Sequence, residues 1–384
     1  MKTLFKLIVV MSFFAVVSCS PIKGLYNNFS AFKHQREIET EANKPIRIFL
    51  DRWGDVYPDL IIEDNLFKRR NSTLENYFCT SDNLQKLYNI YHIPYSGEME
   101  KDGCKTRFNL IQEHLHKKLA DSIDRLAMHK KLVFLIHGYN NTAESASLAF
   151  SEMEKKIVER YPDQKILMVE LYWDGLQDKN KDKNSIKIWD NAQVSAAYVG
   201  MGLRNILNKL QTDNIYVISH SHGAAVITEA LFNVRRFPLE YYKKHQDGKE
   251  LVRFQESFHT PQNNFVIGMI APAIPGMNVF YRYDQRTGPE GAFTSTQKNY
   301  KFINGFNKND KVVNKYIGIS PYFGSTTLAC DSLENIAVQK HFSSTPGLYV
   351  KVDFAPLGYK QTSHQYLDYI KNPASTELLD KMFK

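Results

Sequence analysis

The chain has 384 residues, of which 43% are hydrophobic and 13% aromatic, and this composition excludes collagen-like, coiled-coil and low-complexity proteins. One large folded unit with insertions is expected, because open α/β sheets reach this length as a single domain. The formal net charge is +8, but Lys and Arg are scattered among 41 acids, so nucleic acid is not an expected partner.

The first eighteen residues have the pattern of a secretory signal. Lys2 and Lys6 precede an apolar run, 7–17, that is shorter than the roughly 20 residues of a transmembrane helix. The segment ending at Cys19 resembles the lipobox of bacterial lipoproteins, in which this cysteine is lipidated. That resemblance implies an exported lipoprotein anchored through Cys19 to a cell-envelope membrane, on its periplasmic or surface face. An ordinary cleaved signal with an incidental cysteine is the alternative.

Residues 19–44 read as the lipidated cysteine with a linker, and residues 45–130 as an N-terminal extension that opens with a strand, 45–50. The extension has no metal-ligand spacing and no glycine-rich phosphate loop, so neither a metal nor a cofactor is expected. Cys79 and Cys104 are the nearer pair among the remaining cysteines. An exported protein can keep a disulfide between them, and two buried free thiols are the alternative.

Residues 131–384 form the main expected domain, in which helical stretches alternate with short apolar runs. The expected strands are 132–136, 166–172, 215–219, 265–270, 300–306 and 348–354, and the expected helices are 110–128, 143–161, 189–210 and 223–234. Runs that are apolar on both faces and alternate with helices indicate a doubly wound, mostly parallel α/β sheet. Residues 235–264 and 272–299 are expected as cap-like insertions.

The segment 215–225 combines a strand, a corner and the start of a helix, and it resembles a nucleophile elbow. Such a turn exposes the hydroxyl of its central serine and needs small residues two positions before and after it. Those positions hold Ser219 and Gly223, where glycine is usual at both. Ser221 is therefore the expected nucleophile; a helix N-cap role is the alternative.

The strand 132–136 is followed by a segment that resembles the His-Gly loop of α/β hydrolases. By that resemblance, the backbone N–H groups of Tyr139 and His222 form the oxyanion hole. His137 and Gly138 are expected to support the loop, His137 through hydrogen bonds rather than proton transfer.

The family places its acid after the serine and its histidine last. Asp310 follows the strand 300–306 in a polar loop and is the expected acid, although Asp residues also shape turns. Asp284 is less suitable because it lies in an insertion. Asp353 is less suitable because it lies inside a strand.

The expected general base is His364. It follows the last strand, 348–354, at the edge where ligands bind in open α/β sheets. His341 precedes that strand and would lie at its opposite end. A serine hydroxyl needs such a base, because it is otherwise a poor nucleophile.

The resemblance to α/β hydrolases extends from about Leu132 to the C-terminus, and the stretches VFLIHGYNN and ISHSHGA are similar to a bacterial branch of that superfamily. It implies hydrolysis of an ester, thioester, amide or lipid without choosing among them. The expected function is a membrane-tethered serine hydrolase acting on a small-molecule or lipid ester. A non-catalytic lipoprotein that uses the scaffold for binding or assembly is the alternative.

Overall fold

The computed structural model describes most of the chain beyond the signal and linker: residues 44–58, 74–79, 83–94, 103–175, 185–232, 263–276, 280, 299–315, 326–344, 347–356 and 362–384. The signal, Cys19, Asp284 and most of the two expected insertions lie outside these residues. No helix within the described ranges is long and apolar enough to cross a bilayer.

A seven-stranded sheet with the order β1-β3-β2-β4-β5-β6-β7 lies at the centre of the fold, and every neighbouring pair is parallel. The strands are β1 (Ile46–Leu50), β2 (Lys131–Ile136), β3 (Ile166–Trp173), β4 (Asn214–His220), β5 (Asn264–Ile270), β6 (Tyr300–Phe306) and β7 (Tyr349–Asp353). The predicted doubly wound parallel sheet is confirmed, and each predicted strand agrees with the observed one to within one residue at either end.

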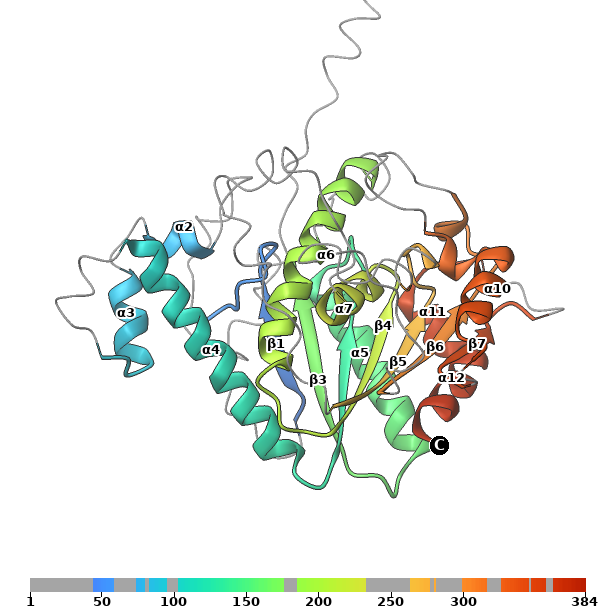
Figure 1. Ribbon diagram of the computed structural model, residues 1–384, viewed down its shortest axis with the longest axis horizontal. Coiled ribbons are helices and arrows are strands. Elements are labelled where there is room, and N and C mark those ends of the chain that lie inside the picture. The colour runs from blue at the N-terminus through green and yellow to red at the C-terminus, as the bar shows by residue number, and fades with distance from the viewer. Residues whose placement is uncertain are drawn as a thin grey trace, which may run out of the picture.

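Helices cover both faces of the sheet (Figure 1). One layer contains α4 (Cys104–Ala127), α6 (Ser185–Leu207) and α7 (Gly223–Phe232), and the other contains α5 (Ala143–Arg160), α11 (Tyr366–Lys371) and α12 (Ala374–Phe383). The remaining helices in the described ranges are α2 (Leu74–Cys79), α3 (Asn83–Ile90), α10 (Ser332–His341), η3 (Val313–Lys315) and η4 (Thr327–Ala329). Because both faces are covered, the central strands are buried over most of their length, which explains their mainly apolar sequences.

The range 45–130 shares this sheet. Strand β1 pairs with the outer edge of β3, and Arg47 donates to Glu170 across the pair at 2.8 Å. Helix α4 packs on α6. A disulfide between Cys79 and Cys104 joins the last residue of α2 to the first residue of α4. Of the two alternatives for these cysteines, the structure therefore contains the disulfide, and the predicted extension supplies an edge strand to the main domain.

The loop that follows β1 lies directly against α6, with a glycine on each side of the contact. Gly54 has a φ of +80°, a conformation that L side chains rarely adopt. A Cβ atom at Gly202 would lie 2.1 Å from the carbonyl oxygen of Gly54, closer than any real contact. The loop and the helix can approach this closely only because neither residue has a side chain.

Gly202→Ala is expected to lower the free energy of unfolding by about 2–3 kcal/mol, because backbone rather than a flexible side chain must move to make room. Urea denaturation measures the change. Gly103→Ala is the matched control, since a Cβ there has no neighbour within 4 Å, and it should be neutral or slightly stabilising. Equal urea midpoints for the two variants would show that the backbone contact between Gly54 and Gly202 has room for a side chain.

Candidate active site

Ser221 lies at a sharp corner between β4 and α7. Its φ is +53°, in the left-handed region that a non-glycine residue seldom adopts unless its surroundings enforce it. Three backbone hydrogen bonds hold it there: the N–H of Ser221 donates to Ile270 at 2.9 Å, and the N–H groups of Ala273 and Ala224 donate to the carbonyl oxygen of Ser221 at 3.0 and 3.2 Å. The predicted sequence of strand, corner and helix is therefore present.

The positions two residues either side of Ser221 are tightly enclosed. A Cβ at Gly223 would lie 2.6 Å from the carbonyl oxygen of His137 and 2.7 Å from that of Ile136, so only glycine fits. Ser219 is fully buried, and its hydroxyl has no hydrogen-bond partner in the described part of the chain. The elbow thus accommodates serine in place of the usual glycine, at the cost of burying one hydroxyl.

The three residues predicted to act together are joined by hydrogen bonds. His364 Nε2 lies 2.7 Å from Ser221 Oγ, and His364 Nδ1 lies 2.6 Å from Asp310 Oδ2. Because an ionised carboxylate can only accept, the hydrogen of a neutral imidazole is on Nδ1. Nε2 is then an acceptor, facing the serine hydroxyl and able to take its proton.

Asp310 is fully buried and follows β6 in a tight turn. Its Oδ1 accepts the backbone N–H groups of Val312 and Val313 at 2.8 and 3.3 Å, and its Oδ2 accepts from His364 and from the hydroxyl of Tyr369, each at 2.6 Å. Burial acts to raise the pKa of Asp310, but the hydrogen bonds and the charge attraction of His364 outweigh it, so the pKa lies below its ordinary value. The carboxylate is ionised at neutral pH.

The ring of His137 is hydrogen-bonded to the loop after β2 and to strand β3. Its Nδ1 lies 2.7 Å from the carbonyl oxygen of Gly138, and the backbone N–H of Trp173 donates to its Nε2 at 3.1 Å. The indole N–H of Trp173 donates to the carbonyl of His137 at 2.7 Å. Burial lowers the pKa of His137 to about 4, so the ring is neutral and fixed between two strands.

The loop after β2 touches the nucleophile. A Cβ at Gly138 would lie 2.9 Å from the Cβ of Ser221, so glycine is required there too. The next residue is Tyr139, whose ring packs edge-on against Trp189 with ring centroids 4.9 Å apart. The ring of Trp189 in turn lies 4.6 Å from that of His222. Tyr139 and His222, the two residues predicted to supply oxyanion donors, therefore pack on the same side chain, that of Trp189.

His341 and Asp353, the alternatives to His364 and Asp310, lie elsewhere in the fold. His341 is the last residue of α10, before β7. Asp353 is the last residue of β7, and its Oδ1 accepts the backbone N–H of Ala355 at 2.8 Å.

Two residues that were not predicted from the sequence, Tyr369 and Asn307, extend the hydrogen-bonded series beyond Asp310. Tyr369 lies on α11 and is buried, and its hydroxyl accepts the side-chain amide of Asn307 at 2.7 Å. A buried tyrosine on an amphipathic helix looks like an ordinary core residue. No sequence pattern distinguishes it.

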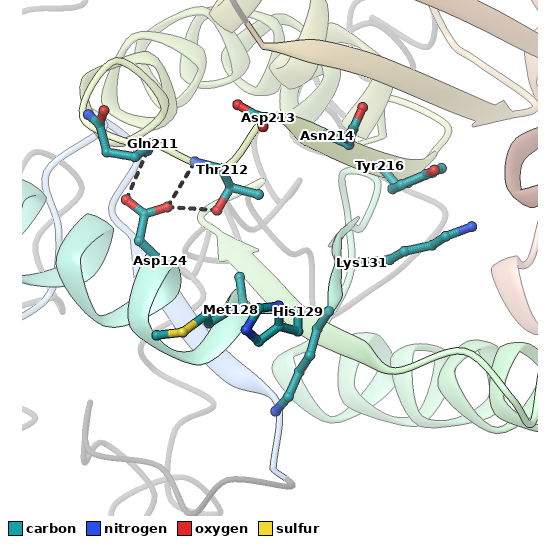
Figure 2. A pocket seen from close by; sticks show the side chains of 11 residues that line it. Asp124, Met128, His129, Lys131, Gln211, Thr212, Asp213, Asn214 and Tyr216 are labelled. Atoms are coloured by element: carbon teal, nitrogen blue, oxygen red, sulfur yellow. Dashed lines mark hydrogen bonds between the residues drawn. The ribbon is translucent and has the colours of Figure 1, made fainter.

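Figure 2 shows the side chains that line an open pocket of about 390 Å³. Because the pocket lies at the start of β2 and β4, it is at the opposite end of these strands from Ser221. It is lined by the end of α4 and by the first residues of β2 and β4. Within it, Asp124 accepts the backbone N–H groups of Gln211 and Thr212 at 2.9 and 3.1 Å, which ties α4 to the loop before β4. In open α/β sheets ligands bind beyond the carboxyl ends of the strands, so this pocket is not the candidate active site.

Comparisons with known proteins agree with this fold. Residues 111–249 match a family described as "Alpha/beta hydrolase of unknown function (DUF900)". A search among curated proteins gave no match. Among solved structures, a lipase B from Aspergillus fumigatus aligns with 13% identity and a TM-score of 0.29, over 67% of this chain and 57% of that lipase, a similarity too low to bear on function. On its sheet topology and on the match of residues 111–249, the chain has the fold of the α/β-hydrolase superfamily.

Proposed function

We propose that this chain is a serine hydrolase that cleaves an ester-type bond, in an acyl ester, a thioester or a lipid, through an acyl-enzyme on Ser221. The observation that carries the proposal is the hydrogen-bonded series from Ser221 Oγ through His364 to the buried carboxylate of Asp310. Nucleophile, base and orienting acid lie within the distances that acyl transfer requires.

In the first half of the proposed reaction, Ser221 Oγ attacks the carbonyl carbon of the substrate as His364 Nε2 takes the hydroxyl proton. The carbonyl oxygen becomes an oxyanion, and the backbone N–H groups of Tyr139 and His222 donate to it. The negative charge of Asp310 stabilises the imidazolium that forms. His364 then gives the proton to the leaving alcohol or thiol, and the acyl group stays on Ser221.

In the second half, water replaces the leaving group. His364 takes a proton from the water as its oxygen attacks the acyl carbon, and returns that proton to Ser221 Oγ when the bond to the serine breaks. The acid is released and the starting state is restored. No group other than the residues already described is needed to balance these steps.

The catalytic proposal is favoured over a purely binding role by two costly features of the site. Ser221 holds a left-handed backbone conformation, and Asp310 keeps an ionised carboxylate away from water. A binding scaffold would need neither feature. Ser219, which stands where glycine is usual, is accommodated without disturbing the elbow.

A fluorophosphonate probe tests the proposal directly, because it reacts covalently with an activated serine. The folded protein is expected to be labelled, and the heat-denatured protein is not. Hydrolysis of p-nitrophenyl esters from acetate to palmitate then ranks the acyl chains. Folded protein that is neither labelled nor active on any ester of the series would contradict the proposed function.

We further propose that the protein is exported and held at a cell-envelope membrane by lipid on Cys19. The signal pattern of residues 1–18 supports this proposal. The Cys79–Cys104 disulfide supports it as well, because such bonds persist in oxidising compartments outside the cytoplasm.

Cys19→Ala is expected to move the protein from the membrane fraction to the soluble fraction, because each buried methylene of the lipid contributes about 0.8 kcal/mol to membrane binding. Fractionation followed by immunoblotting measures the distribution. Cys330→Ala is the control, since this half-buried thiol belongs to the folded domain, and it should stay in the membrane fraction. A wild-type protein that is exported but soluble would show that the lipobox interpretation is wrong.

A further inference from the structure

We infer that Tyr369 is a positioning residue for the proposed hydrolysis: its hydroxyl fixes the carboxylate of Asp310 and determines how much of the negative charge on Oδ2 is left for His364. The inference rests on the proposed function and deepens it. It assigns a role to a residue of α11 that does not touch the nucleophile.

The carboxylate of Asp310 has all its acceptor positions filled. An ionised carboxylate offers about four lone-pair sites. Two on Oδ1 accept backbone N–H groups from its own turn, and two on Oδ2 accept His364 Nδ1–H and the hydroxyl of Tyr369. The carboxylate is therefore held against rotation on both oxygens, and Tyr369 supplies the only one of these four donors that is a side-chain hydroxyl.

The direction of the phenol bond follows from its other partner. The side-chain amide of Asn307 donates through Nδ2 to the oxygen of Tyr369 at 2.7 Å, while Asn307 Oδ1 accepts the backbone N–H of Asn309 at 3.0 Å. These two bonds fix which end of the amide faces the tyrosine. The phenol oxygen thus receives one hydrogen and must point its own hydrogen at Asp310.

Tyr369 and His364 share one oxygen atom, and this sharing gives the hydroxyl its effect. Each donor draws negative charge on Oδ2 towards itself, so a bond from Tyr369 weakens the attraction between Asp310 and a protonated His364. Less attraction makes the imidazolium less stable, and the neutral form that acts as base persists to lower pH. The hydroxyl of Tyr369 should therefore extend the pH range of activity to lower pH.

Within the described residues, the two other titratable side chains that face the pair from neighbouring elements do not change charge near neutral pH. His220, from β4, faces His364 with ring centroids 5.0 Å apart, and burial lowers the pKa of His220 well below its ordinary value. Cys330, at the end of η4, faces Asp310, and burial raises the pKa of its thiol to about 12. Both groups stay neutral, so the acid limb of a pH profile reports on His364 and its hydrogen-bonded partners.

Tyr369→Phe tests the inference, with Tyr366→Phe as a matched control. Tyr366 is buried on the same helix, and its hydroxyl has no hydrogen-bond partner within the described ranges. With an ester that the wild type cleaves, Tyr369→Phe should lower kcat/KM on the alkaline plateau about tenfold, because Asp310 is no longer held against rotation and orients His364 less well. It should also move the midpoint of the acid limb upward by roughly half a pH unit. Tyr366→Phe should change neither.

A second substitution is expected to shift the midpoint of the acid limb in the opposite direction. Placing 3-fluorotyrosine at position 369 keeps the ring and the hydroxyl but makes the phenol a stronger donor, so the midpoint of the acid limb should move to lower pH. Opposite shifts cannot come from a general loss of packing. This variant also keeps the test decisive if Tyr369→Phe fails to fold.

Acid limbs that coincide for the wild type and both Tyr369 variants would overturn the inference. In that case Ser221 would still be labelled and active, so the proposed function would stand. A wild-type protein that is neither labelled nor active contradicts the proposed function, and this inference with it.

Discussion

Ser221→Ala is expected to abolish fluorophosphonate labelling and to lower ester hydrolysis by about 10⁶-fold, the loss typical when the nucleophile of such a site is removed. The hydroxyl oxygen lies 2.7 Å from His364 Nε2, and no other hydroxyl is bonded to that nitrogen within the described residues. The thermal midpoint should change little, because alanine keeps the same backbone corner. Activity and labelling are measured on protein whose fold has been checked by circular dichroism.

Ser219→Ala is the matched control for this prediction. It removes a buried hydroxyl two residues away that has no hydrogen-bond partner in the described part of the chain. The variant should be labelled like the wild type and be at least as stable, because the cost of burying that hydroxyl is gone. Labelling that persists in Ser221→Ala would refute the nucleophile assignment.

His364→Ala is expected to lower turnover by a similar factor of about 10⁶, because serine and histidine act as a unit in acyl transfer. The imidazole is the only side chain in the described structure that bonds to both Ser221 and Asp310. Turnover of one acyl ester, measured on folded variants, provides the comparison.

His341→Ala is the control for that comparison and should retain nearly full turnover. His341 ends α10, and its ring packs on Phe342 with ring centroids 5.1 Å apart. If His341→Ala were inactive while His364→Ala kept wild-type turnover, the hydrogen-bonded series would have been assigned through the wrong histidine.

The strands could be predicted from the sequence because most of their residues are buried between two layers of helices, and each strand therefore appears as a short, mainly apolar run. The segment 300–306 is an example in which prediction and structure coincide. The candidate site followed from the same reasoning. Ser221, Asp310 and His364 each come after a strand, and parallel strands place such residues along one edge.

Other features depend on contacts that no local pattern encodes. Strand β1 was predicted, but its place beside β3 was not, because the pairing joins residues as far apart as Arg47 and Glu170. The role of Tyr369 depends on which residue its hydroxyl meets, and burial alone looks the same for a core tyrosine. The choice between a disulfide and free thiols for Cys79 and Cys104 needed the distance between two helices, with their Cα atoms 5.5 Å apart.

The place of β1 in the sheet has a consequence for how the chain folds. The strand β1 is synthesised before the other strands. Its partner is synthesised much later, since Arg47 pairs with Glu170, which lies 123 positions further along the chain. Closing so long a loop is slow, because its entropy is lost before any contact compensates. Until then Ile46, Ile48 and Leu50 lack their native cover. We therefore expect the first strand synthesised to be among the last to pair, and strand exchange between two unfinished chains to be a misfolding hazard at this edge of the sheet.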